Sequence, residues 1–378
     1  MTRSFKRLII FTLIIFIAIR SYLQLLADLA LKYIPFKPSF PYWETVLEKL
    51  GPNWLWLWGN FDGAHYIKIS QFGYREALTQ AFFPIYPFLI RIISYLTQNS
   101  LISGLLISHL SFIGFIYFFI KLGRLDYSKK TLQWAVLLLL LFPTSFYLFS
   151  VYSESLFLFL TVLVFYLSRK KKFLLAAIIA GIASATRLVG IFLLPAILWE
   201  YWQVNKKKNY FHLAGLSVFS ASGLLLYLNF LSKRFSDKFI FISSQPGFGA
   251  GRQVNKLILI YQVAFRYIKM LFTISPQNDI YFVVLFEFFL SIGFLGLIIW
   301  AALKKLRPSY LLFIIPAYLL PTLTGTFLSM PRFLLTAFPL FYLLGNLKNT
   351  KLKTLIAVIS TFLLSWAFLR FSRGYWLS

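Results

Sequence analysis

The apolar run Leu8-Ile-Ile-Phe-Thr-Leu-Ile-Ile-Phe-Ile-Ala-Ile19 decides the class of this fold, because it follows a basic N-terminus and continues to about Leu31. About 20 predominantly apolar residues are enough for an α-helix to cross a bilayer, and this run is longer. It is also too long for the apolar region of a signal peptide, and no clear small-residue cleavage site ends it. We therefore expect a retained first membrane helix.

Composition indicates the same class along the whole chain. Of the 378 residues, 59% are hydrophobic and 13% are charged, whereas soluble domains usually carry about 25% charged residues. Backbone groups inside a bilayer must be satisfied within the protein, so repeated apolar runs predict helices. We predict an all-α polytopic membrane protein, with residues 1–378 forming a single transmembrane domain. The chain has no cysteine, which excludes disulfides and thiol catalysis.

The basic residues predict the topology. A net charge of +27 would suggest nucleic acid in a soluble protein. Here Lys and Arg lie mainly in short clusters between apolar runs, which is the positive-inside pattern, so we expect contact with membrane lipids and not with nucleic acid. If all clusters lie inside, the N-terminus is inside too. The clusters are Arg3 to Arg7, Lys121 to Lys130, Arg169 to Lys172, Lys206 to Lys208, Lys304 to Arg307 and Lys348 to Lys353.

This topology predicts about eleven spans. They lie near 8–31, 101–121, 131–150, 155–168, 173–187, 189–204, 211–231, 281–302, 309–328, 332–346 and 354–371. Residues 82–97 and 256–274 would displace basic clusters outward if they crossed, so we predict interfacial or re-entrant helices on the outer face. Two long outer loops follow, about 32–100 and 232–280, and long loops on one face usually carry function. The sequence shows no internal repeat, which weakens a secondary-transporter interpretation.

Rare polar residues gather at the outer ends of the predicted helices. The chain has only 11 Asp and Glu, and charges at a membrane are costly to keep, so each is a functional candidate. One shared polar site at the outer membrane boundary is the economical interpretation. In the predicted threading its members are Asp62, His65, Glu154, Arg187 and Arg332.

Each candidate also has a structural interpretation. Asp62 and His65 could form an exposed pair or a helix cap, and Glu154 could cap the helix that follows it. Arg187 and Arg332 could snorkel to the interface. Arginines on the outer face run against the positive-inside bias, however, and phosphate binding would explain them. His65 has no second ligand at metal-binding spacing, so no metal site is predicted.

Other conspicuous residues have simpler interpretations. The tryptophans Trp54, Trp56 and Trp58 are most simply an aromatic belt at the membrane interface. His109 and Glu287 lie within apolar runs, where we expect internal hydrogen bonds and assign no role. The glycine-rich segment 245–251 could gate a site or form a plain solvent loop.

The motifs around the outer polar residues resemble those of PIG-V-type mannosyltransferases. Trp58-Gly-Asn-Phe-Asp62-Gly-Ala-His65-Tyr66, followed by Gly73-Tyr74, is similar to the family's Trp-Asp-x-x-His-Tyr segment, with Phe61 in place of the tryptophan. Further segments resemble other motifs of the family in the same order, over about residues 54–341. They are Phe82-Phe-Pro-Ile-Tyr-Pro-Phe-Leu-Ile-Arg91, Tyr152-Ser-Glu-Ser-Leu-Phe157, Ala185-Thr-Arg187 and Ser329-Met-Pro-Arg-Phe333.

The resemblance implies a glycosyltransferase of the GT-C fold with its site on the extracytoplasmic face. Such an enzyme moves a hexose, typically mannose, from a polyprenyl-phosphate-linked donor to a hydroxyl of a lipid or glycan acceptor. The composition, rich in Lys and Phe, is typical of a prokaryotic relative, so the prokaryotic plasma membrane is the expected location. Phosphate is already a good leaving group, so no cofactor or metal is required, although some folds of this kind use a metal.

On this hypothesis Asp62 is the general base of a single, inverting displacement. Glu154 orients the acceptor or the base, and His65 binds a sugar or phosphate oxygen. Arg187 and Arg332 neutralise the departing lipid phosphate. The remaining candidates for substrate or phosphate binding are Tyr66 and Tyr152.

Two other classes of function stay open. A non-enzymatic flippase of a lipid-linked phosphate would use the same arginines during translocation, and it would need polar residues along a path through the bilayer. The predicted helices are nearly bare of charge between the two faces, which counts against it. A scaffold or assembly subunit with a degenerate site is the third interpretation.

Overall fold

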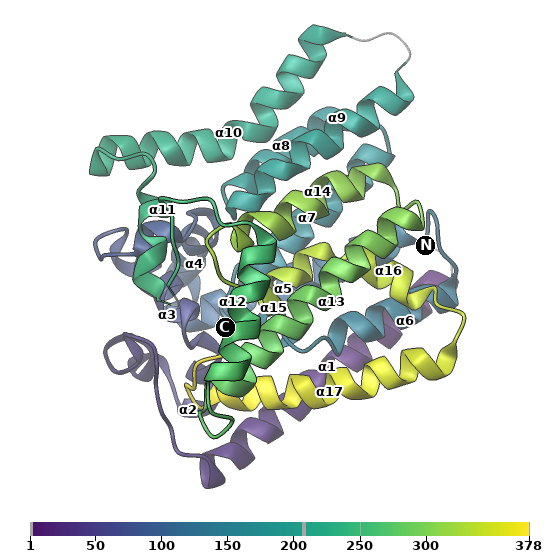
Figure 1. The fold of residues 1–378 in the computed structure, drawn as a ribbon. Coiled ribbons are helices and arrows are strands. Elements are labelled where there is room, and N and C mark those ends of the chain that lie inside the picture. Colours follow the sequence, from purple (N-terminus) through teal and green to yellow (C-terminus); the bar gives the residue numbers. More distant parts are fainter. Residues whose placement is uncertain (1–2, 206–208, 250, 378) are drawn as a thin grey trace. The chain divides into compact units, whose positions relative to one another are not determined.

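The computed structural model describes residues 3–205, 209–249 and 251–377 (Figure 1). Within these ranges the secondary structure is helical, and none of the described residues forms a strand. The all-α prediction is therefore confirmed. The predicted basic cluster Lys206 to Lys208 lies outside the described residues.

Five helices are long and apolar enough to cross a membrane, by length and composition. Each of them coincides with a predicted span, which supports the polytopic membrane class. The topology of about eleven spans stays a prediction. The five are α1 (Arg3–Tyr33), α5 (Ser100–Gly123), α10 (Tyr210–Phe235), α13 (Tyr281–Leu303) and α17 (Thr350–Ser372).

Shorter helices occupy the other predicted spans, and three predicted extents were wrong. The helix expected over 309–328 ends at Thr322. The helix expected over 131–150 ends at Leu140, just before Pro143, and a 3-10 turn, η5 (Ser145–Leu148), follows. The helix expected over 332–346 is interrupted because Pro339 lacks an amide hydrogen and starts a new helix. The shorter elements are α6 (Lys129–Leu140), α7 (Glu154–Arg169), α8 (Phe173–Ser184), η6 (Leu188–Phe192), α9 (Leu193–Val204), α14 (Pro308–Thr322), α15 (Met330–Phe333), η8 (Leu334–Ala337) and α16 (Pro339–Gly345).

The two predicted long loops also contain helices. The pieces expected at 82–97 and 256–274 are α4 (Ile85–Thr97) and α12 (Ile260–Thr273). Helix α12 is amphipathic: Val263 and Tyr267 are buried, whereas Phe265 and Phe272 are exposed. The other elements are η1 (Trp43–Leu47), η2 (Glu48–Leu50), α2 (Asn53–Trp56), η3 (Leu57–Gly59), α3 (Asp62–Phe72), η4 (Thr79–Ala81), α11 (Ile240–Ser243) and η7 (Gln245–Phe248).

The chain divides into two compact units. The first unit comprises the described residues up to Gly73, together with Ile85–Tyr166 and Phe338–Leu377. In it α1 packs against α6 and α17, and α4 packs against α5 (Figure 1). The second unit comprises Tyr74–Pro84 and the described residues of Leu167–Ala337. In it α8 packs against α10, α14 against α9, and α12 against α13.

Glycines allow the close crossing of α8 and α10 in the second unit. A Cβ atom on Gly223 would lie 2.0 Å from the carbonyl oxygen of Gly181, and one on Gly181 would lie 2.4 Å from that of Phe219. Small residues at such crossings let two backbones pack closely in a membrane. The crossing fixes the end of α8, which leads directly into the turn that carries Arg187.

A buried ion pair joins α9 to α14 in the same unit. Glu200 is 2% exposed and accepts two hydrogen bonds from the guanidinium of Arg307, one of them 2.6 Å long from Nη2. Ser309 donates a further bond of 2.5 Å to the same carboxylate. Arg307 belongs to a predicted inner basic cluster, and here it neutralises a buried acid.

Candidate functional site

Asp62 begins helix α3 directly after a strained turn in the first unit. The preceding residue, Phe61, has φ 58° and ψ −118°, a conformation that residues other than glycine rarely adopt. Such strain costs about 1–3 kcal/mol and persists only where the surroundings hold it. Strained residues cluster at functional sites, so this outlier directs attention to the half-buried carboxylate that follows it.

Tyr152 and the C-terminal part of α17 hold this turn. The Tyr152 hydroxyl donates to the carbonyl oxygen of Asn60 (2.9 Å) and accepts from the amide of Asp62 (3.2 Å). The side chain of Asn60 donates to the carbonyl oxygen of Phe371 (2.8 Å), and the Phe61 ring stacks on the Phe371 ring. Tyr152, predicted to bind substrate, is fully buried and fixes the backbone on both sides of Phe61.

The segment that carries Glu154 lies along α3. The amide of Val151 donates to the carbonyl oxygen of Trp58 (2.9 Å), and the Tyr66 hydroxyl lies 2.9 Å from the Ser153 hydroxyl. Glu154 begins α7 and is 4% exposed. The structure thus brings five predicted site residues into one region of the first unit, namely Asp62, His65, Tyr66, Tyr152 and Glu154.

His65 is buried beside charged and aromatic groups. Its ring meets the Tyr42 ring edge-on, with 5.3 Å between centres. Burial lowers the pKa of His65 most strongly; Lys68 lowers it further, and Asp62 raises it. The imidazole is therefore neutral near pH 7, and one of its nitrogens can donate a hydrogen bond while the other accepts one.

Lys68 is a member of this region that the sequence prediction missed. It lies three residues after His65 on α3, is half-buried, and places its ammonium 3.7 Å from the centre of the Tyr42 ring. A cation over an aromatic face is a favourable arrangement. A sequence signal existed, because this lysine lies in a predicted outer segment, against the positive-inside bias.

Trp58 is anchored to α1. It is fully buried and Trp56 is 5% exposed, whereas Trp54 is 54% exposed, so the prediction of an interface belt was wrong for Trp56 and Trp58. The indole of Trp58 donates to Gln24 (3.0 Å), and Arg20 donates to the same oxygen (3.1 Å). The Arg20 guanidinium also lies 3.4 Å from the centre of the Trp58 ring. Helix α1 therefore supports the turn that leads to Asp62.

The second unit brings the two predicted arginines together. Arg187 lies in the turn between α8 and η6, where a Cβ atom on Gly190 would lie 2.5 Å from the carbonyl oxygen of Ala183. Arg332 lies in α15 and is 8% exposed. Both guanidinium carbons are 5.1 Å from the centre of the Phe333 ring. Two positive groups from separate turns thus share one aromatic side chain.

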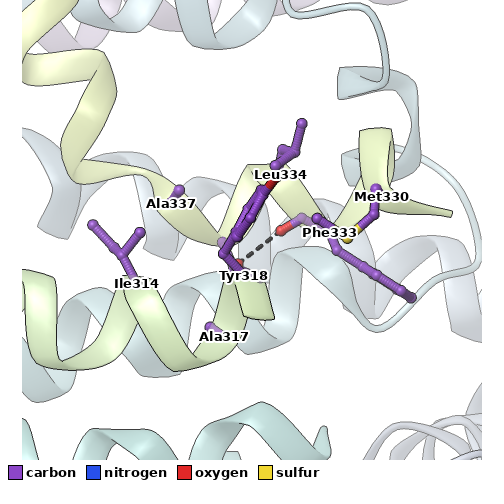
Figure 2. Close-up of a pocket in the computed structure, with 8 residues that line it drawn as sticks. Ile314, Ala317, Tyr318, Met330, Phe333, Leu334 and Ala337 are labelled. Carbon is purple, nitrogen blue, oxygen red and sulfur yellow. Dashed lines mark hydrogen bonds between the residues drawn. The ribbon is translucent and has the colours of Figure 1, made fainter. Parts of the chain in front are cut away.

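A small hollow behind Phe333 is apolar and has no room for a water molecule. Figure 2 shows side chains of α14 on one side of it and those of α15 and η8 on the other. It serves to pack the Phe333 ring and is too small for a substrate. The labelled residues that line it are Ile314, Ala317, Tyr318, Met330, Phe333, Leu334 and Ala337.

The two polar residues within apolar runs form internal hydrogen bonds, as predicted. Nδ1 of His109 lies 2.7 Å from the carbonyl oxygen of Leu105, and Glu287 accepts a 2.6 Å bond from Tyr267. Over the described part of the chain, no group of three or more His, Asp or Glu could hold a metal ion.

No family model, curated protein or solved structure matches the chain. The candidate residues therefore fall into two sets, each built within one unit: the acids, His65 and the tyrosines in the first, and the arginine pair in the second. A site shared by both sets stays a prediction.

Proposed function

We propose that this protein is a membrane glycosyltransferase that uses a polyprenyl-phosphate-linked sugar. The observation that carries the proposal is the pair Arg187 and Arg332, whose guanidinium groups flank the Phe333 ring. Two guanidinium groups at one aromatic ring concentrate positive charge there, which favours an anion with several acceptor oxygens. Phosphate suits them best, because a guanidinium can bind it through two parallel hydrogen bonds.

The first unit supplies groups suited to proton transfer. Asp62 lies at the N-terminus of α3, where the helix dipole favours its ionised form. We assign it as the general base. The acceptor hydroxyl gives its proton to Asp62 while its oxygen forms a bond to the anomeric carbon. The bond from that carbon to the phosphate oxygen breaks, and the lipid phosphate leaves with the electron pair. One displacement inverts the anomeric configuration.

The other residues have supporting roles in this reaction. Arg187 and Arg332 neutralise charge on the departing phosphate. Glu154 orients the acceptor, and neutral His65 binds a sugar oxygen. Tyr152 positions Asp62 because its hydroxyl is already bonded on both sides of the strained residue. Mannose as the sugar, a lipid or glycan acceptor and the extracytoplasmic face rest on the resemblance to PIG-V-type enzymes.

One observation favours a lipid-phosphate flippase as the second candidate. Arg20, Gln24 and Asp28 form a chain of side-chain hydrogen bonds along α1, with distances of 3.1 and 3.2 Å. A polar strip within a membrane helix is the feature that translocation requires. The first two members are also used to hold Trp58, however, which explains them without transport.

The experiment is an Asp62→Asn substitution in purified protein. Labelled mannosyl polyprenyl phosphate is supplied with a membrane lipid extract, and sugar transfer and release of polyprenyl phosphate are followed. Loss of the base should lower kcat by about 100-fold or more, with donor binding retained. Asp126→Asn, an exposed aspartate after α5, is the control. Activity near wild type in Asp62→Asn removes Asp62 as the base. Reconstituted lipid translocation without any product supports the flippase.

A further inference from the structure

Glu287 is a buried acid within a membrane-spanning helix, and the proposed reaction gives it no role. It lies in the second turn of α13, in the second unit, and is 3% exposed. Ionisable groups at such positions are costly and usually functional. Its Oε2 accepts a 2.6 Å hydrogen bond from the Tyr267 hydroxyl, which comes from the buried face of α12.

The Tyr267 hydroxyl forms hydrogen bonds both to Glu287 and to a short segment, residues 326–329. It accepts a 3.1 Å bond from the amide of Phe327 and lies 3.1 Å from the Thr326 hydroxyl. That hydroxyl accepts in turn from the amide of Leu328 (3.1 Å). The backbone of Ser329 also faces the Glu287 carboxylate. One buried polar network therefore holds Thr326, Phe327 and Leu328, the residues that lead into Ser329.

The segment needs this support because the backbone is left-handed at its last residue, Ser329, and at Gly325, the residue just before it. Gly325 has φ 86° and Ser329 has φ 64°, and the second value is unfavourable for a residue with a side chain. Arg266, also on α12, donates to the carbonyl oxygen of Gly325 (2.9 Å). Helix α12 thus holds the segment at its start through Arg266 and at its centre through Tyr267.

The segment leads directly into the turn that carries Arg332. The carbonyl oxygen of Ser329 accepts from the amides of Arg332 and Phe333, both at 3.1 Å. The conformation of Ser329 therefore sets the start of α15, and with it the direction of the Arg332 side chain and the Phe333 ring. A change at Glu287 would act first on Tyr267, through their shared hydrogen bond. A change at Tyr267 would act on the segment 326–329, and the Ser329 carbonyl oxygen would pass the effect to the start of α15 and Arg332.

We propose that Glu287 and Tyr267 are positioning residues of the phosphate site. They fix the turn 326–329 so that Arg332 lies beside Arg187 at the Phe333 ring. The inference rests on the proposed function, in which these arginines bind the donor phosphate. Neither Glu287 nor Tyr267 contacts substrate in this assignment; both act through Arg332.

The test measures binding of polyprenyl phosphate without a sugar, together with KM for donor and acceptor. Tyr267→Phe keeps the aromatic ring and removes the hydroxyl that bonds to Glu287 and to the segment 326–329. This substitution should weaken phosphate binding by about tenfold. Acceptor KM should be unchanged. Glu287→Ala should weaken binding more than Glu287→Gln, because the amide oxygen can still accept from Tyr267. Tyr342→Phe is the matched control: Tyr342 is also fully buried, and its hydroxyl donates to the Phe119 carbonyl oxygen (2.6 Å) in the first unit.

A double-substitution cycle separates the possible failures. If the network acts through Arg332, Tyr267→Phe should have little further effect in an Arg332→Gln background. Unchanged binding in Arg332→Gln alone rejects the phosphate site and so the proposed function. Weakened binding in Arg332→Gln with wild-type binding in Tyr267→Phe and Glu287→Ala rejects only the positioning role. The positioning role is also overturned if Tyr267→Phe weakens phosphate binding equally in the wild-type and Arg332→Gln backgrounds. It is likewise overturned if Tyr342→Phe weakens binding as much as Tyr267→Phe does.

Discussion

The two candidate regions differ in the charge of their side chains and in the groups that hold them. Around Asp62, in the first unit, a strained backbone is held by neutral hydroxyl and amide groups, and the candidate side chains are acids and a neutral histidine. Around Arg332, in the second unit, cations share an aromatic ring, and a buried carboxylate anchors the neighbouring turn. The first arrangement suits a base that must point at one proton. The second suits a partner for distributed negative charge.

This difference makes the proposed tasks separable by mutation. A base acts only in the chemical step, so its loss lowers kcat and leaves donor binding intact. A phosphate-binding arginine acts on the bound donor and on the departing phosphate, so its loss affects both binding and kcat. Substitutions in the two regions should therefore differ in their effects on kcat and on donor binding.

The largest expected effect comes from removing both arginines. Hydrogen bonds to charged groups contribute about 1.5–3 kcal/mol each, so Arg187→Gln with Arg332→Gln should weaken polyprenyl phosphate binding roughly 100-fold or more. Equilibrium binding of a labelled lipid phosphate to the purified protein measures this. Arg234→Gln, at the exposed end of α10, is the control and should bind like wild type. Intact binding in the double variant would abolish the contrast between the regions.

The next effect concerns stability of the second unit alone. Gly223→Ala places a methyl group 2.0 Å from a backbone oxygen of α8 and should cost about 2–3 kcal/mol by forcing the helices apart. Gly215→Ala, on the same helix with nothing within 4 Å of the added atom, should be neutral or slightly stabilising. Thermal unfolding of the two variants in detergent gives the comparison. Equal melting temperatures would mean that the crossing of α8 and α10 is looser than described.

The sequence predicted the long helices well because length and apolar content suffice for them. It failed between Leu140 and Glu154, where residues as apolar as Phe146 and Leu148 form a 3-10 turn. There Ser145 and Ser150 bond to backbone carbonyl oxygens, which stabilises the irregular path. Hydrogen bonds from serine hydroxyls to the backbone do not change the hydrophobic periodicity of the sequence. The apolar pattern alone therefore could not show that the helix ends at Leu140.

The sequence supplied the charged members of the candidate site but not the groups that support them. Rarity singled out Asp62, and a predicted position against the positive-inside bias singled out Arg187 and Arg332. The proposed positioning roles of Tyr152 and Tyr267 depend on backbone conformations at Phe61 and Ser329, which no residue pattern specifies. The sequence shows which charged residues are costly to keep in a membrane protein. Hydrogen-bond geometry is needed to identify the residues that position them.

A smaller effect is expected from Tyr152→Phe. Without the hydroxyl, the Asn60 carbonyl oxygen and the Asp62 amide lose their shared partner beside the strained Phe61. The turn should relax and misplace the base, lowering kcat about tenfold with unchanged affinity for polyprenyl phosphate. Tyr227→Phe, which removes a 2.7 Å bond to the Gln80 carbonyl oxygen in the second unit, is the control. A loss of phosphate affinity in Tyr152→Phe would contradict the separation of tasks.

The smallest effect is a pH dependence carried by His65. Its pKa is lowered mainly by burial, so the folded state resists protonation more than the unfolded chain does. Its contribution to stability is therefore complete above the unfolded pKa of about 6.5, and is lost as the pH falls through the lower folded pKa. When the pH is lowered from 7.5 to 5.5, the melting temperature of His65→Gln should fall by less than that of the wild-type protein. His212→Gln on α10 keeps His65 and should retain the wild-type loss. An equal acid loss in His65→Gln would show that other groups, and not this buried imidazole, carry the acid sensitivity.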